Sequence, residues 1–508
     1  MSVRNNDLKK CDIYAEYYKI TGMWWAKWCD ILGPLRDRLN NRRGDEGRTR
    51  INNGFERWIA DDYVKISYDA KKYRKCPDAK NLRCLIYDYL QIFDFVNAFH
   101  YIDQYIESKY QNYKKYQRMK CRLKNFLHRI KDELKKREDI IVFWTDCVSY
   151  YELEWLPKLQ EKGKNALFFD NAYTPTPYTR CVMSVMSNKW LNIDDFGKDD
   201  LKDQNINNSI LLRKVHGYGY EPKYFGHGKG PCVFDERIRH FNLRQRDSSC
   251  KTCFSAINEL IHSQKKQFMI IHTVWETHPP YWYPDKNGRK LIELFGYENG
   301  ELEKQTGRVY GQIRGAAAYW DEQLDFYSGL FGERSTKIYM SDHGKEYRQY
   351  QLKEWVEATN HIILLLQSRY AANRVENRLF TLENFTELIE AVMRAHQTGR
   401  EIDLEKVFEK PFMRVQKVDT YNKILVQSLK AMHCEEGGQA YRGIRTDEDY
   451  YLRFRDRELY YRNGDEETNL IDDPKYADRI EELRALAGDY FIDIDKNEKF
   501  KYARELYH

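Results

Sequence analysis

Several features that would assign the chain to a common class of protein are missing from its sequence. No run of apolar residues approaches the roughly 18 that a transmembrane helix needs, so no membrane span is expected. The first residues, MSVRNNDLKK, carry charges where the apolar core of a signal peptide would lie. The 11 cysteines are odd in number and lack the spacing of a disulfide framework, which is typical of reduced thiols. We therefore expect a cytoplasmic protein.

Signatures of nucleotide and nucleic-acid binding are also missing. No P-loop and no GxGxxG element follows an expected strand. The net charge of +6 over 508 residues is too small to indicate a nucleic-acid partner, so none is expected. One CxxC pair, Cys250 and Cys253, is weak evidence for zinc without a second pair.

The most informative stretch begins with the apolar run Ile140–Trp144, which ends abruptly at Thr145 and Asp146. The run is short, bounded and rich in β-forming residues, as expected of a buried parallel strand. In open α/β sheets, functional groups gather just beyond the carboxyl ends of such strands. Asp146 therefore lies where a functional carboxylate is expected.

A turn rich in hydroxyl groups follows, with the sequence TPTPYTR from Thr174 to Arg180. Its two prolines keep the backbone extended before a helix that is expected over Cys181–Met186. A hydroxyl at a helix N-terminus, near a carboxylate at a strand end, is suited to act as a metal-activated nucleophile.

Strands and helices alternate between residues 139 and 410. This pattern predicts an α/β fold with a mainly parallel central sheet covered on both faces by helices. The expected strands are Ile140–Trp144, Ala166–Phe169, Phe268–Thr273, Lys337–Ser341 and Ile362–Gln367, and the expected helices are Tyr310–Phe331 and Leu382–Arg394.

Two flanking regions complete the expected domain organisation. Residues 1–138 are predicted to form a helical N-terminal extension, in which residues 113–134 have an apolar face and a basic face. The basic face is either the solvated side of a packed helix or a surface for an anionic polymer or for anionic lipid headgroups at the inner membrane face. Residues 411–508 are predicted to form a small α+β subdomain with a helix at Tyr421–Met432, strands at Tyr441–Thr446, Tyr450–Phe454 and Glu458–Arg462, a turn at Asn463 and Gly464, and a terminal helix.

A second cluster of polar residues, Ser341-Asp342-His343-Gly344, follows the expected strand Lys337–Ser341. An aspartate and a histidine at a strand end offer one oxygen and one nitrogen ligand, which suits Mn²⁺ or Zn²⁺.

These segments together resemble the sulfatases of the alkaline phosphatase superfamily. The segment from Thr176 to Arg180 corresponds to the family's nucleophile motif Cys-x-Pro-Ser-Arg, and Phe169–Tyr173 (FDNAY) precedes it as in the family. The Ser341–Gly344 segment matches the SDHG metal motif, and the region from Gly443 to Pro474 resembles the family's C-terminal subdomain. The resemblance covers residues 139–490 and implies an alkaline-phosphatase-like three-layer sandwich, with residues 139–410 as its catalytic domain.

The resemblance implies a site for one divalent metal. Its ligands would be Asp146, Asp342, His343 and the hydroxyl of Thr176. Many sulfatases carry a second aspartate after the first, but Cys147 stands at that position, which argues against a calcium-type site formed only by oxygen ligands. Mn²⁺ is the favoured ion, with Zn²⁺ second.

Thr176 occupies the nucleophile position of the motif, where a threonine cannot be converted to formylglycine. The resemblance is therefore closer to lipoteichoic acid synthases and phosphoethanolamine transferases, in which threonine attacks phosphorus. A bound metal would lower the pKa of this hydroxyl. Arg180 would either clamp the equatorial oxygens of the substrate or brace the loop.

Other site residues are implied by local similarity alone. His278, in the sequence THPPY, resembles the family histidine that faces the substrate and is expected to be catalytic. His227, in FGHGK, resembles a segment of the lipoteichoic acid synthases and is expected to bind substrate together with Lys229 and Arg237.

These resemblances predict a metal-dependent hydrolase or transferase that acts on a phosphate ester, a diester being favoured, through a covalent phosphothreonine. Sulfuric ester hydrolysis is the alternative activity, and a catalytically inactive binding module is the alternative of another class. The expected partners are a phosphorylated or sulfated small molecule or glycan precursor, together with an anionic membrane surface if the basic helix binds one.

Overall fold

The computed structural model describes most of the chain, and all structural statements below refer to the described residues. These are residues 13–23, 57–175, 179–187, 209–227, 239–243, 248–274, 276–277, 283–284, 302–344, 359–409, 412–417, 441–454, 457–462 and 468–487.

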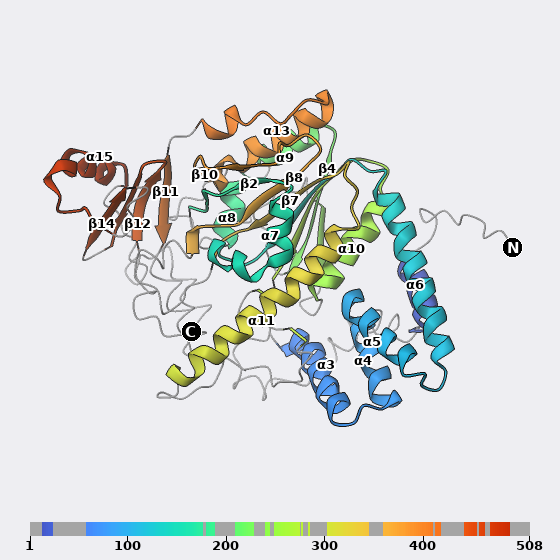
Figure 1. Cartoon of the computed structure of the whole chain (residues 1–508). Helices are drawn as coiled ribbons and strands as arrows, with labels where there is room; N and C mark the ends of the chain where they lie inside the picture. Colours follow the sequence, from blue (N-terminus) through green and yellow to red (C-terminus); the bar gives the residue numbers. More distant parts are fainter. Residues whose placement is uncertain are drawn as a thin grey trace, which may run out of the picture.

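An eight-stranded sheet forms the centre of this described part, in the order β5-β4-β6-β1-β7-β8-β2-β9 (Figure 1). Its strands are β1 (Ile140–Thr145), β2 (Leu167–Phe169), β4 (Glu221–His227), β5 (Arg239–Leu243), β6 (Gln267–Thr273), β7 (Thr336–Ser341), β8 (Leu364–Gln367) and β9 (Arg374–Glu376). Neighbouring strands run parallel, except that β8 runs antiparallel to both β7 and β2. The predicted α/β fold with a mainly parallel sheet is confirmed.

The five expected strands are all present, with ends that shift by at most two residues. Strand β4 was not predicted, because its sequence EPKYFGH contains a proline, a lysine and a glycine and has no apolar run. Its position in the sheet next to β6 places His227 at the carboxyl edge of the sheet.

Alternate residues of the strands face two separate hydrophobic cores, as the two-residue period of a strand requires. In β1, Ile141 and Phe143 belong to the first core, whereas Ile140, Val142 and Trp144 belong to the second. The helices on the second side are α8 (Thr179–Met186), α9 (Ile210–Gly217) and α13 (Phe385–Thr398).

Helices from the N-terminal region and from the segments between strands contribute to the first core. They are α1 (Ile13–Thr21), α3 (Arg57–Lys75), α4 (Ala79–Gln91), α5 (Phe95–Glu107), α6 (Tyr113–Leu134), α7 (Pro157–Gly163), α10 (Ser249–His262) and α11 (Leu302–Ser328). The expected helix Tyr310–Phe331 corresponds to α11, which begins earlier and ends before Gly329.

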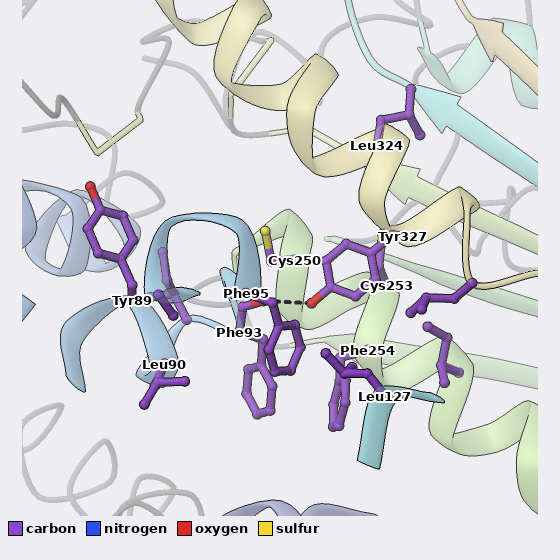
Figure 2. Packing of buried hydrophobic residues seen from close by; sticks show 14 of the residues in the cluster. Tyr89, Leu90, Phe93, Phe95, Leu127, Cys250, Cys253, Phe254, Leu324 and Tyr327 are labelled. Carbon is purple, nitrogen blue, oxygen red and sulfur yellow. Dashed lines mark hydrogen bonds between the residues drawn. The ribbon is translucent and has the colours of Figure 1, made fainter. Parts of the chain in front are cut away.

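Aromatic side chains join the N-terminal helices to α10 and α11. The ring of Phe254 in α10 stacks on Phe93 with centroids 4.6 Å apart, and Phe95 of α5 stacks on Phe326 of α11 at 5.7 Å. The hydroxyl of Tyr327 donates to the carbonyl of Phe93 over 2.6 Å (Figure 2). The N-terminal helices therefore share one hydrophobic core with the sheet.

The amphipathic character predicted for residues 113–134 is confirmed in α6. Its apolar residues are buried, among them Tyr116, Leu123 and Phe126. Two residues of its basic face form ion pairs inside the protein, Lys120 with Asp103 and Arg129 with Glu16, so part of this face is already occupied. No helix in the described ranges combines the length and hydrophobicity needed to cross a membrane.

A four-stranded antiparallel sheet follows near the C-terminal end and packs against α15 (Ala477–Ala487). Its strands are β11 (Phe412–Lys417), β12 (Tyr441–Thr446), β13 (Asp449–Arg453) and β14 (Glu458–Arg462). It contacts the main body through Arg445, whose guanidinium lies 3.9 Å from the centroid of the Tyr173 ring. Tyr173 in turn stacks on His361 at 4.4 Å, and His361 stacks on Tyr150 at 3.9 Å. The expected helix Tyr421–Met432 and the turn at Asn463 and Gly464 lie outside the described residues.

Candidate metal centre

The register of the central strands brings two predicted site segments to one edge of the sheet. Thr145 at the end of β1 pairs with Thr273 at the end of β6 and with Ser341 at the end of β7. The backbone N–H of Asp146 continues this alignment by donating to the carbonyl of Thr273 over 2.9 Å. The residues that follow β1 and β7, Asp146 and Asp342, therefore lie close together.

The same face of the sheet carries the candidate ligands. Trp144 and Met340, each two residues before one of the aspartates, point into the second hydrophobic core. His272 lies two residues after Ile270, which points into the same core. Helix α8, which begins three residues after Thr176, packs on this core as well.

The two oxygens of Asp342 have different surroundings. Oδ1 accepts the backbone N–H groups of Cys147 over 3.0 Å and of His343 over 2.8 Å. Cys147 can point its N–H there because it adopts a left-handed backbone with φ of 62°, which is uncommon for a residue other than glycine. Oδ2 is buried and has no hydrogen-bond partner among the described residues.

One ring nitrogen of His343 lies close to both aspartates. Its Nδ1 lies 2.8 Å from the carbonyl oxygen of Gly344, which can only accept, so Nδ1 carries the proton. Nε2 is the ring nitrogen left for a metal, and it lies 3.7 Å from Oδ1 of Asp146 and 3.6 Å from Oδ2 of Asp342. Ligand atoms of the three residues all lie within 4.8 Å of one another.

A divalent cation fits this arrangement. Three electron-pair donors converge on one buried point, and burial together with the charge of Asp146 raises the pKa of Asp342. A cation between the donors would offset the repulsion between the two carboxylates and would satisfy Oδ2 of Asp342. The mixture of two oxygens and one imidazole nitrogen is typical of Mn²⁺ or Zn²⁺ sites.

A further histidine, His272 of β6, lies beside Asp146. Its Nε2 is 3.5 Å from Oδ2 of Asp146, and its Nδ1 is 2.7 Å from the hydroxyl of Tyr224 in β4. The sequence predicted His272 only as a strand residue. The signal that would have found it is the alignment of β6 with β1, which places His272 opposite Trp144.

The segment after β6 is fixed by a second buried carboxylate, Glu276. Oε1 accepts the hydroxyl of Tyr63 from α3 over 2.5 Å, and Oε2 accepts the hydroxyl of Ser249 at the start of α10. Burial raises the pKa of Glu276. Nearby, the carboxylate of Asp94 accepts the hydroxyl of Tyr319 from α11 over 2.9 Å. The N-terminal helices thus hold the chain directly before the predicted catalytic residue His278.

The structure brings together only some of the predicted site residues. Asp146, Asp342 and His343 form the cluster. Arg180 lies on α8 and His227 on β4, but the placement of their side chains is not described. The remaining predicted residues lie outside the described residues: Thr176, Lys229, Arg237 and His278.

Comparisons with known proteins give similarity at the level of structure. No family model matches the chain, and no curated protein matches it. A candidate sulfatase from Bacteroides thetaiotaomicron covers 69% of this chain and 91% of its own length, with 13% identity and a TM-score of 0.48. The phosphonate monoester hydrolase from Silicibacter pomeroyi covers 70% of this chain and 97% of its own length, with 12% identity and a TM-score of 0.47. An alkaline phosphatase superfamily protein from Vibrio parahaemolyticus covers 75% of this chain and 97% of its own length, with 12% identity and a TM-score of 0.44.

Proposed function

We propose that the chain is a divalent-metal-dependent enzyme that hydrolyses or transfers a phosphate ester, a diester being favoured, with Thr176 as nucleophile. The observation that carries the proposal is the convergence of Asp146, Asp342 and His343 at the carboxyl edge of the sheet. Open α/β sheets place their reactive groups at this edge. A buried cluster of acceptors without a cation would destabilise the fold, so its presence favours a functional ion.

The three ligands would hold one cation, Mn²⁺ being favoured over Zn²⁺. Such an ion would supply Lewis acidity to a phosphoryl oxygen and would lower the pKa of a nearby hydroxyl. The two carboxylates and the imidazole of His343 keep their donor atoms within 4.8 Å of one another, so little rearrangement is needed to bind it.

The chain's own groups would carry out the bond changes. Oγ1 of Thr176 releases its proton to solvent and forms a bond to phosphorus, while the bond between phosphorus and the leaving oxygen breaks. His278 donates a proton to that oxygen and is reprotonated by solvent. Arg180 binds the equatorial oxygens in this scheme. Water or a hydroxyl acceptor then attacks the phosphothreonine, and Thr176 recovers its proton from the attacking group.

The proposed substrate is a phosphorylated small molecule or glycan precursor whose charged oxygens are bound by a basic group of side chains. These side chains are His227, Lys229 and Arg237. Because two basic residues of α6 already form internal ion pairs, an anionic membrane surface would contact the remaining exposed ones, such as Lys115, Arg118 and Lys124.

Turnover of model esters tests the proposal. With Mn²⁺, the wild-type protein is expected to cleave bis-p-nitrophenyl phosphate faster than p-nitrophenyl phosphate and not to cleave p-nitrophenyl sulfate. Thr176→Ala should abolish turnover, whereas Thr176→Ser keeps a hydroxyl and should retain part of it.

Three outcomes would contradict the proposal in different ways. Turnover of the sulfate ester alone would favour sulfuric ester hydrolysis. Undiminished turnover by Thr176→Ala would show that Thr176 is not the nucleophile. A protein that binds neither Mn²⁺ nor Zn²⁺ and cleaves no ester would be an inactive binding module.

A further inference from the structure

We infer that His272 and Tyr224 form a positioning relay that orients Asp146 for metal binding, which extends the site onto β4 and β6. The inference rests on the proposed metal site and adds two residues to it. It concerns how the carboxylate is held, since the ligands themselves are Asp146, Asp342 and His343.

The tautomer of His272 decides the direction of its hydrogen bond with Tyr224. Either the hydroxyl of Tyr224 donates to Nδ1 of His272, or Nδ1 donates to the hydroxyl. In the first case Nε2 carries the proton and faces Oδ2 of Asp146, a carboxylate oxygen that can accept it. In the second case a nitrogen lone pair would face Oδ2 of Asp146 without the proposed cation between them, which is unfavourable in a buried site. The first arrangement is therefore the stable one.

Burial keeps the relay in this state. Tyr224 and His272 are 1% and 3% exposed, and burial raises the pKa of Tyr224, so its hydroxyl remains a donor. Nε2 of His272 is buried and has no hydrogen-bond partner in the described part of the chain. Its distance of 3.5 Å from Oδ2 of Asp146 is slightly longer than a hydrogen bond, so a small rotation of the carboxylate would form one.

The two oxygens of Asp146 then have separate roles. Oδ2 faces His272, whereas Oδ1 faces Nε2 of His343, on the side where the metal would lie. Outer partners of this kind fix the orientation of a metal ligand and typically raise metal affinity about 10- to 100-fold. We expect His272 to contribute a factor in this range.

Gly226 on β4 leaves room for the relay. A Cβ atom at this position would lie 2.5 Å from the hydroxyl oxygen of Tyr224. The ring of Tyr224 therefore lies over Gly226, and an alanine there would push the hydroxyl away from His272.

Mn²⁺ affinity, measured by isothermal titration calorimetry on the full chain, tests the relay. His272→Leu should weaken binding about 10- to 100-fold. His272→Gln can place an amide N–H near the position of Nε2 and should recover most of the affinity. Tyr224→Phe and Gly226→Ala should each weaken binding by a smaller factor, because the proton of His272 can then move to Nδ1.

A second tyrosine–histidine pair provides the matched control. The hydroxyl of Tyr220 lies 2.7 Å from Nδ1 of His396, and Nε2 of His396 lies 2.7 Å from the hydroxyl of Thr336 at the start of β7, the opposite edge of the sheet. Tyr220→Phe removes an equivalent buried hydrogen bond, so it should change stability as Tyr224→Phe does but leave Mn²⁺ affinity unchanged.

The possible failures are distinguishable. If the wild-type protein binds no Mn²⁺, the proposed function fails and the relay fails with it. If it binds Mn²⁺ but His272→Leu binds equally well, the relay alone is wrong. If His272→Gln is as weak as His272→Leu, then His272 does not act through a donated proton, and the inference is overturned in favour of direct ligation.

Discussion

Two pairs of buried carboxylates face different kinds of chemical group. Asp94 and Glu276 receive hydroxyl donors from Tyr63, Ser249 and Tyr319. Asp146 and Asp342 instead converge with Nε2 of the His343 ring. The first pair is stabilised by the protein alone, whereas the second is an arrangement of acceptors that a cation would complete.

This difference would separate a structural carboxylate from a proposed metal ligand. Glu276 and Asp342 are 1% and 0% exposed, and burial raises the pKa of both, so neither burial nor titration distinguishes them. What distinguishes them is the chemical nature of the groups they face: O–H donors at Glu276, and no hydrogen-bond donor among the described residues at Oδ2 of Asp342.

The largest expected effect comes from removing one charge at the acceptor cluster. Asp342→Asn should keep the two backbone hydrogen bonds to Oδ1 but lower Mn²⁺ affinity by at least about 100-fold, more than loss of an outer partner does. The metal-free variant should be as stable as the wild type or more stable by about 1 kcal/mol, because two buried like charges no longer repel. Calorimetry and urea denaturation measure these two quantities.

Asp94→Asn is the control for that variant. The acceptor of Tyr319 becomes a weaker one, so metal-free stability should fall by about 1–2 kcal/mol while Mn²⁺ affinity stays the same. Equal stability changes in the two variants would mean that the two carboxylate pairs do not differ as described.

A second prediction concerns the donors around Glu276. Glu276→Ala would leave the hydroxyls of Tyr63 and Ser249 without their acceptor and would open a cavity, so unfolding free energy should fall by about 2–4 kcal/mol. Tyr63→Phe, which removes one donor, should lower it by about 1–2 kcal/mol. Urea denaturation of the metal-free proteins measures both, and stability unchanged in Glu276→Ala would contradict the assignment.

A third prediction uses the metal itself. Mn²⁺ at 100 times its dissociation constant should raise the unfolding free energy of the wild type by about 2.7 kcal/mol, since only the folded state presents the cluster. Thermal unfolding should show this shift in Tyr63→Phe as well but not in Asp342→Asn. A shift retained in Asp342→Asn would place the ion elsewhere.

The smallest expected effect is a dependence on pH. Burial raises the pKa of Glu276, so the folded state binds its proton more tightly than the unfolded state does. This stabilisation is fully present below the unfolded pKa of about 4.3 and is lost as pH rises through the raised folded value. Relative to Glu276→Gln, which does not titrate, the metal-free wild type should lose unfolding free energy as pH rises through the folded-state pKa of Glu276. A constant difference between pH 4 and pH 8 in urea denaturation would contradict it.

Much of the fold could be predicted because its signals are local. The runs Ile140–Trp144 and Phe268–Thr273 are apolar and bounded, and both are central strands. Asp146 and the Asp342-His343 pair were found because each directly follows a strand. Strand β8 was located, but its antiparallel direction was not predicted, because the period of a strand is the same in both directions.

The residues that were missed depend on contacts between distant segments. His272 lies beside Asp146 only because β6 aligns with β1, and Tyr224 reaches it from a strand without an apolar run. The bond between Tyr63 and Glu276 joins residues 213 positions apart, and no pattern within either segment indicates it. Sequence patterns therefore predict the residues of the candidate metal cluster better than the groups packed around them.

The shared core of the N-terminal helices and the sheet has a consequence for synthesis on the ribosome. Phe93 packs against Phe254 and accepts a hydrogen bond from Tyr327, which is 234 positions later in the chain. The first helices are therefore synthesised long before the partners that cover their aromatic rings. Folding from the N-terminus, domain by domain, cannot bury these rings until those partners are made. Until α10 and α11 emerge, these rings form an exposed apolar surface on the nascent chain, of the kind that molecular chaperones bind.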